Sequence, residues 1–260
     1  MYRFLTAVLL ALLLAACGGP SASKPSAPAV ENAAQGVYFS GYTHPSITAI
    51  VLPDGRFYAP LANSSWSLAG LAAGQGTATS GVFTGSYRYF GGLGAHAGTV
   101  NASFLPGSSF NGTLSGNGSS IPINGISLAS DVYNPAVPAS ASAISGHFVA
   151  SILGSSCGVN VTITSGGTFT GTSDSGSACA CNFSGTLAPD PKKNIYNATV
   201  NFPATQCPIS NQSASGVAVL YKYPYPDGSG VDGFAILAVT NDSATLLMGF
   251  RDPNNLAPVP

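Results

Sequence analysis

The chain is 260 residues long and nearly neutral, with eight Lys and Arg against nine Asp and Glu and a formal net charge of −1. Charged residues make up only 7% of it, whereas soluble domains average about 25%. The sequence has no basic run, which argues against nucleic acid as a partner. Its polar surface must therefore be built from Ser, Thr, Asn and Gly, as in extracytoplasmic β-proteins.

Residues 1–16 predict a lipoprotein signal peptide. Arg3 precedes an apolar run from Leu5 to Ala16, which is shorter than the roughly 20 residues of a membrane-spanning helix and has the layout of a signal peptide. The end of this run, Leu14-Ala15-Ala16-Cys17, resembles the bacterial lipobox. That resemblance implies cleavage before Cys17 and acylation of Cys17, and several acyl chains anchor a protein stably. The alternative is an ordinary signal peptide followed by a chance cysteine.

Residues 17–35 predict a lipidated cysteine followed by a flexible tether. The segment after Cys17 is GGPSASKPSAPAVENAAQ, with Lys24 and Glu31 as its only charges. Such a composition cannot bury enough apolar surface to fold. Residue 18 is Gly rather than Asp, which in the lipobox family favours the outer membrane. We therefore expect a protein that is lipid-anchored at the outer membrane. The sequence does not decide between the periplasmic side and the surface side.

Beyond residue 35 the sequence shows the period-two alternation of β-strands and little helical periodicity. Apolar residues alternate with Thr, Ser or Asn in SITAIVL, GTVNASF, SFNGTLSG, VNVTIT, GTFTGT and YNATVNF. This pattern is typical of strands with one buried and one wet face. Turn sequences such as Pro53-Asp54-Gly55 separate the runs, and the 32 glycines fit many tight turns. The sequence predicts an all-β fold with antiparallel meander connections.

An internal repeat is suggested by two similar segments. The segments that begin at Gly36 and Gly146 both run from Gly-x-aromatic through a loop and an alternating strand to a Gly turn and an aromatic-bearing strand. Further on, VFTGSYRYF is expected to match CNFSGTLAP, and TVNASFLPG to match NATVNFPAT.

The repeat predicts two tandem small β-barrel or sandwich domains. Domain 1 is expected at 36–130 and domain 2 at 145–260, and the Pro- and Ser-containing residues 131–144 are expected to link them. Each half, of about 100 residues, is long enough for a core of its own. The alternative is one larger barrel with the linker along its rim.

The four cysteines beyond Cys17 predict two disulfides. Cys157, Cys179, Cys181 and Cys207 lie in the second half, and they lack the C-x2-C spacing of zinc and redox motifs. The expected compartment is also oxidising. Cys181 opens one alternating strand and Cys207 follows another, so antiparallel pairing would bring them together. That leaves Cys157 to pair with Cys179.

The sequence predicts no enzyme activity, no metal site and no cofactor. Its three histidines, His44, His96 and His147, are scattered, and no G-x-S-x-G stretch is present. Asp227 and Asp232 lie in a predicted hairpin, which lacks the oxygen-ligand density of a calcium loop.

Tyr221, Tyr223 and Tyr225 form a candidate binding surface. They alternate in YKYPYP, so they share one face if the strand persists. An exposed tyrosine row with few charges would suit a protein or a glycan ligand. The alternative is an aromatic ladder that packs the sheet.

The segment CNFSGTLAPDPKKNIYNATVNFPATQC, with NDSATLLMGFRD near the C-terminal end, resembles a group of uncharacterised Gram-negative outer-membrane lipoproteins. In that group C-x-F-S-G-T is followed by N-x-Y, an alternating strand and a cysteine, and the chain finishes with an apolar strand ending in Arg or Lys. The resemblance covers mainly the second half and implies the pair Cys181–Cys207. It carries no activity.

These features together predict a non-enzymatic, lipid-anchored lipoprotein of the cell envelope, with a β-rich binding or structural module. The membrane is the expected partner, through the lipid on Cys17. Two other classes stay open: an envelope hydrolase built around one of the histidines, and a barrel that carries an apolar small molecule in an enclosed cavity.

Overall fold

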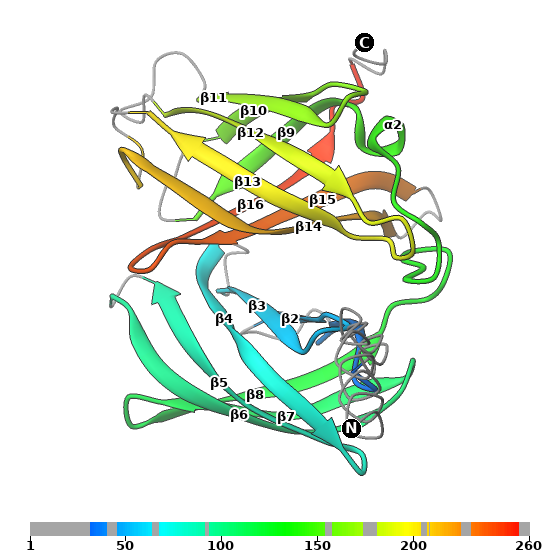
Figure 1. Cartoon of the computed structure of the whole chain (residues 1–260), viewed down its shortest axis with the longest axis vertical. Coiled ribbons are helices and arrows are strands. Elements are labelled where there is room, and N and C mark those ends of the chain that lie inside the picture. The colour runs from blue at the N-terminus through cyan, green and yellow to red at the C-terminus, as the bar shows by residue number, and fades with distance from the viewer. Residues whose placement is uncertain are drawn as a thin grey trace, which may run out of the picture. The chain divides into compact units, whose positions relative to one another are not determined.

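The computed structural model describes residues 32–40, 46–63, 68–91, 94–153, 158–173, 181–203, 207, 209–224 and 230–254. The chain divides into two units, Met1–Val30 and Glu31–Pro260, and every described residue belongs to the second. This unit contains two closed barrels of eight antiparallel strands, each a meander in which consecutive strands pair (Figure 1). The predicted pair of tandem all-β barrels is confirmed, and the alternative of one larger barrel is wrong.

The first barrel closes on itself where its first and last strands pair. Its strands are β1 (Gly36–Phe39), β2 (Ser46–Val51), β3 (Arg56–Ala62), β4 (Leu68–Thr79), β5 (Val82–Gly91), β6 (His96–Leu105), β7 (Ser109–Gly116) and β8 (Ser119–Ser127). β1 and β8 meet with Tyr38 opposite Ser127. This pairing joins the two ends of the sheet.

The second barrel repeats this plan after a short helix, α2 (Ala141–Ile144). Its strands are β9 (Gly146–Ile152), β10 (Gly158–Ile163), β11 (Thr168–Ser173), β12 (Asn182–Pro189), β13 (Tyr196–Phe202), β14 (Gln212–Pro224), β15 (Gly230–Val239) and β16 (Ala244–Arg251). β16 closes the barrel against β9. No helix within the described residues is both long and apolar enough to cross a membrane.

Inward-facing aromatic rings fill both barrels. In the first, the Phe83 ring lies 5.7 Å from that of Phe57 and 5.5 Å from that of Phe110, measured between centroids. In the second, the Phe148 and Phe234 rings lie 4.8 Å apart. An eight-stranded barrel has an interior just wide enough for side chains to fill. Each barrel thus has its own packed core, as the alternating sequence requires.

Glycines inside the strands make room for these rings. Phe-x-Gly recurs in β5, β7, β11 and β12. Across β11 and β12, Phe169 lies opposite Gly185 and Phe183 lies opposite Gly171. A Cβ on either glycine would collide with a facing ring. Part of the high glycine content, expected to lie in turns, therefore serves the barrel interior, where the ring covers the glycine backbone.

The chain joins the first barrel earlier than expected. Ala34 is fully buried, and its carbonyl accepts a 3.0 Å hydrogen bond from the Tyr38 hydroxyl. The Asn32 amide donates to the Pro53 carbonyl at 2.8 Å. Residues 32–35 are therefore packed on the barrel, and their assignment to the flexible tether of 17–35 is corrected, because a buried side chain and backbone bonds fix them. Residues 17–31 lie outside the described part of the chain.

The connection between the barrels is held on the second barrel. The Tyr133 ring is buried, and its hydroxyl donates to the Asn194 carbonyl at 2.8 Å. The Lys222 amide donates to the Val132 carbonyl, also at 2.8 Å. The predicted linker 131–144 is thus tied to the second barrel at Val132 and Tyr133.

Arg251 ties the last strand to the start of the second barrel. Its Nε lies 3.1 Å from an Asp232 carboxylate oxygen, and its Nη1 donates to the Ser145 carbonyl at 2.6 Å. The guanidinium also lies 4.9 Å from the centre of the Phe148 ring. Arg251, the arginine of NDSATLLMGFRD, therefore stabilises the closure of the barrel where β16 pairs with β9.

The predicted repeat agrees with the structure only in its first part. The segments that begin at Gly36 and Gly146 form β1–β3 and β9–β11, the first three strands of each barrel. The match of VFTGSYRYF with CNFSGTLAP is wrong, because β5 is the fifth strand of its barrel and β12 is the fourth. The match of β6 with β13 is displaced in the same way. Short Ser/Thr/Gly strands resemble one another at any position, so similarity alone did not fix the strand order.

Candidate binding site between the two barrels

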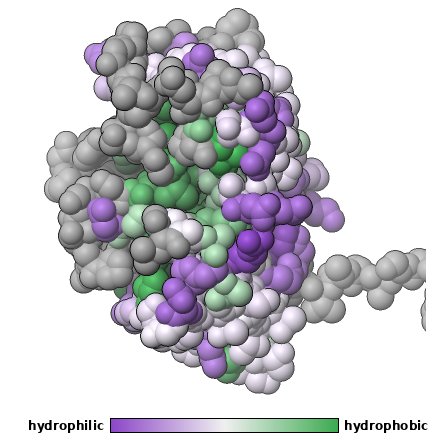
Figure 2. Space-filling model, turned by 90° about the vertical axis from the view of Figure 1, so that its left-hand side faces the viewer, coloured by the Kyte–Doolittle hydropathy of each residue, from purple (hydrophilic) through white to green (hydrophobic). Residues whose placement is uncertain are grey.

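The two barrels meet through an apolar cluster made of outward-facing side chains. Leu237 of β15 is fully buried in this cluster, while its neighbours Ile236 and Ala238 point into the barrel. Several strands are therefore buried on both faces, which gives near-continuous apolar runs. Figure 2 shows hydrophobic residues at about mid-height of one face, bordered by hydrophilic ones. The buried members are Val37, Ile50, Leu52, Tyr58, Leu71, Tyr133, Leu153, Ile195, Val217, Val219, Ala235, Leu237 and Leu246.

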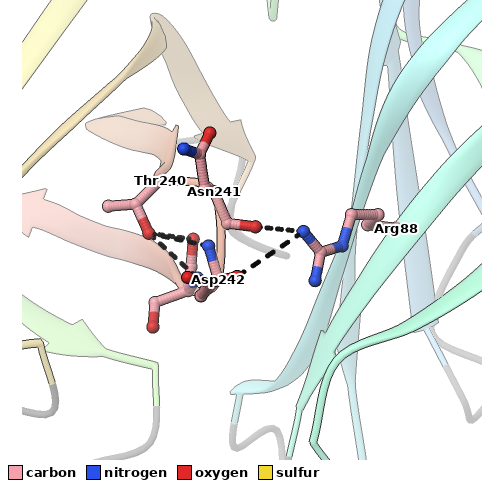
Figure 3. A network of polar contacts seen from close by, with 5 residues as sticks. Arg88, Thr240, Asn241 and Asp242 are labelled. Carbon is pink, nitrogen blue, oxygen red and sulfur yellow. Dashed lines mark hydrogen bonds and ion pairs between the residues drawn. The ribbon is translucent and has the colours of Figure 1, made fainter.

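A polar contact joins the barrels beside this cluster (Figure 3). Arg88 of β5 donates from Nη1 to the backbone carbonyl of Asn241, in the turn between β15 and β16. The same guanidinium nitrogen lies 3.9 Å from an Asp242 carboxylate oxygen. Arg88 also packs over the Phe90 ring at 5.6 Å from its centre. One cation of the first barrel thus fixes the turn of the second.

The β15–β16 turn is held in shape by Thr240. The Thr240 hydroxyl accepts hydrogen bonds from the backbone amides of Ser243, at 2.9 Å, and Asp242, at 3.2 Å. The Thr240 amide in turn donates to the Ser243 carbonyl at 2.8 Å. Side-chain bonds of this kind are the reason Thr, Asn, Asp and Ser favour turns. The turn therefore presents the Asn241 carbonyl to Arg88.

Two grooves flank this turn, one on each side. The first has a volume of about 850 Å³ and lies between Arg56 and Tyr58 of β3 and the outward faces of β13 and β14. The second, of about 610 Å³, lies between the same two residues, the turn, and the faces of β4 to β6. Because residues of both barrels line each groove, the grooves exist only when the barrels are packed together.

Arg56 lines both grooves, and its positive charge is paired with a carboxylate. Its Nε lies 2.7 Å from an Asp54 carboxylate oxygen, and the Gln75 amide nitrogen donates to the Asp54 carbonyl at the same distance. Burial raises the pKa of Tyr58, although the neighbouring Arg56 opposes part of that rise. The Tyr58 phenol therefore stays protonated at neutral pH, and the groove wall carries a matched ion pair beside an uncharged ring.

A third groove, of about 350 Å³, lies on the second barrel alone. Hydroxyl and amide side chains of β10 to β13 line it, among them Thr170, Ser184 and Asn201. None of the strands β10, β11, β12 and β13 contains an Asp, Glu, Lys or Arg. The outer face of these four strands is thus polar without charge.

The predicted cysteine pairing is confirmed for one bond. Cys181 and Cys207 form a disulfide with their Cα atoms 4.6 Å apart, and both belong to the core of the second barrel. Cys157 and Cys179 lie outside the described residues, so their pairing stays a prediction. Cys17, the expected lipidation site, also lies outside them.

The structure gives a packing role to one of the three candidate tyrosines. Tyr221 is partly buried against the inter-barrel cluster, and its ring covers Gly233 on the neighbouring strand. The backbone of Tyr223 belongs to β14, but its side chain and all of Tyr225 lie outside the described residues. The binding surface made by the three residues stays a prediction, and for Tyr221 the packing alternative is favoured.

The two described histidines lie in different barrels, and each contacts a different neighbour. The His96 ring lies 4.8 Å from that of Tyr89 in the first barrel, and His147 Nδ1 lies 3.1 Å from the Thr162 hydroxyl in the second. His44 lies outside the described residues. Among the residues that the structure describes, no group of three or more His, Cys, Asp and Glu could hold a metal ion.

The residues that line the grooves were missed by sequence reasoning. One signal was present: VAVL at 217–220 and FAILAV at 234–239 break the period-two alternation with apolar residues at every position. Such runs indicate a second buried face. They locate the interface on β14 and β15 but do not identify its partner strands.

Fold and site together define a tandem pair of eight-stranded antiparallel barrels with a groove on each side of the inter-barrel contact. No protein-family model, curated protein or solved structure matches the chain. The functional proposal therefore rests on the residues of this chain.

Proposed function

We propose that this protein is a non-enzymatic, lipid-anchored lipoprotein of the cell envelope, and that its paired barrels serve as a binding module at the outer membrane. The lipobox-like sequence that ends in Cys17 supports the anchor, and the low charge supports an extracytoplasmic setting. The membrane is then a partner through the lipid, and the paired barrels are the part that meets a ligand.

The binding role rests on the position of the grooves, which lie outside the barrels and not inside them. Aromatic rings in contact occupy the interior of each barrel, whereas the three grooves open on the outer faces of the strands. A carrier of an apolar small molecule needs an enclosed apolar cavity. A module that holds its ligand on the outside agrees better with filled barrels.

The anchor is tested by metabolic labelling of the full-length chain with radioactive palmitate in a Gram-negative host. The wild-type protein should carry label and fractionate with the outer membrane, because thioether and amide-linked acyl chains hold it there. The Cys17→Ser variant should lose both properties. A variant with Cys181→Ala and Cys207→Ala is the matched control and should keep the label.

Two results of this labelling would contradict the anchor. An unlabelled wild-type protein, or label that persists in the Cys17→Ser variant, would show that the lipobox interpretation is wrong. Protease treatment of intact cells then separates the two sides of the membrane, since only a surface-exposed chain is cleaved.

A further inference from the structure

The outer face of the second barrel carries hydroxyl and amide side chains in rows that run across the strands. Cross-strand pairing joins Ser184 to Asn201 and Asn201 to Ser213. The neighbouring row pairs Thr186 with Thr199 and Thr199 with Ser215. Successive members of a row are about 4.8 Å apart, the spacing of strands in a sheet. That interval is close to the length of one sugar unit in an extended glycan.

The first inter-barrel groove takes in one end of these rows. Asn197 and Thr199 of β13 and Ser213 and Ser215 of β14 line one wall of it. All four are at least partly exposed, with the alternate residues of both strands buried inside the barrel. The third groove takes in the other end, from Thr162 to Asn201. Both grooves therefore lie along one polar surface and share strand β13.

Charge in the groove is matched within the protein. The guanidinium of Arg56 pairs with Asp54, and the Asp242 carboxylate lies 3.9 Å from Arg88. The strand wall opposite has no charge. A charged ligand would lose hydration without gaining an opposite charge. Hydroxyl and amide groups both donate and accept hydrogen bonds, as the hydroxyls of a sugar do.

We propose that the inter-barrel groove binds a chain of uncharged sugars, which runs from Arg56 and Tyr58 onto the hydroxyl rows of β13 and β14. This site deepens the binding role proposed above and rests on it. Tyr58 lines the groove. Thr199 and Ser215, successive members of one row, supply hydrogen bonds in register with successive sugar units, and Ser213 of the neighbouring row lies beside them. The ligand class is a neutral polysaccharide.

The test uses the detergent-solubilised full-length protein and a set of polymers. The neutral probes are chitin, cellulose and dextran, and the charged comparison is alginate. We expect retention by at least one neutral polymer and none by alginate. Retention should persist in about 1 M salt, where the Debye length falls to about 3 Å, because the contacts carry no net charge.

A matched pair of variants locates the site. Thr199→Val with Ser215→Ala removes two hydroxyls from the groove and should weaken binding about tenfold or more, since one hydrogen bond corresponds to roughly a fivefold change. Thr99→Val with Ser115→Ala is the control. Thr99 and Ser115 form the same cross-strand pair on β6 and β7, and the control should bind like the wild type.

Three results would overturn the proposal: no retention by any of the neutral polymers, release by salt, or equal loss in both double variants. Palmitate labelling at Cys17 is measured on the same preparations. A protein that carries the palmitate label but is not retained by any neutral polymer would contradict the glycan site and still support the lipid anchor. Retention without label supports the glycan site and removes the anchor.

Discussion

The Cys181–Cys207 disulfide should supply a large part of the stability of the second barrel. The bond joins residues 26 positions apart, and closing a loop of that size in the unfolded chain is worth about 3.5 kcal/mol at 25 °C. Single domains are stable by about 5–15 kcal/mol in total. We expect the Cys181→Ala, Cys207→Ala variant to lose about a quarter to two-thirds of its unfolding free energy.

The position of the bond explains why the loss should be felt by the whole barrel. Cys181 precedes β12, and its amide donates to the Ser173 hydroxyl at 3.2 Å at the end of β11. Cys207 lies in the connection between β13 and β14, with Cys207 and Ile209 both buried in the core. Without the bond, this connection loses its covalent link to the start of β12, and the core beneath it becomes easier to open.

Urea unfolding of the full chain followed by far-ultraviolet circular dichroism measures the effect. With a slope of about 1–3 kcal/mol per M, the midpoint should fall by about 1–3.5 M. Mass spectrometry without reductant verifies the bond in the wild type. An unchanged midpoint in the double alanine variant would refute the loop-closure reasoning. A further fall when reductant is added to that variant would support the predicted pair Cys157–Cys179.

Two smaller perturbations have equally definite signs. Thr245 is buried, and its hydroxyl has no hydrogen-bond partner among the described residues. Thr245→Val should therefore raise the unfolding free energy by about 1 kcal/mol, whereas Thr245→Ser should lower it. A valine variant that unfolds at a lower urea concentration than the wild type would contradict this. Burial raises the pKa of Tyr38 from 10.0 to about 12, so the folded state holds this proton more tightly, and the resulting stability is lost as the pH rises through 10 to 12. Over that range the unfolding free energy of the wild type should fall more steeply than that of Tyr38→Phe, and parallel curves would contradict the assignment.

The all-β meander could be predicted because many of its strands have a local signal. In YNATVNF the apolar residues recur at every second position, and the structure makes this segment β13 with alternating buried and exposed side chains. The pairing of Cys181 with Cys207 followed from the same reasoning, because the two cysteines flank neighbouring strands. Local periodicity is sufficient where one face of a strand is wet.

The site could not be predicted, because its residues come together only when the barrels pack. Arg88 and Asn241 are separated by 153 positions and meet through a side chain and a carbonyl. Nothing in the neighbourhood of Arg88 in the sequence marks it as different from any surface arginine. The Phe-x-Gly pairs were also missed, because a glycine in a strand suggests a turn until the facing ring is known.

The sequence by itself predicted the all-β meander and one disulfide, since these depend on period-two patterning and on turns within short stretches of chain. Only the tertiary structure decided that the outward apolar side chains of β14 and β15 pack against those of β2 and β3, and that grooves remain on either side of the turn between β15 and β16. The physical reason is that exposing the outward-facing Leu237 to water costs free energy. The local sequence therefore indicates that this side chain is covered, but it does not identify the surface that covers it.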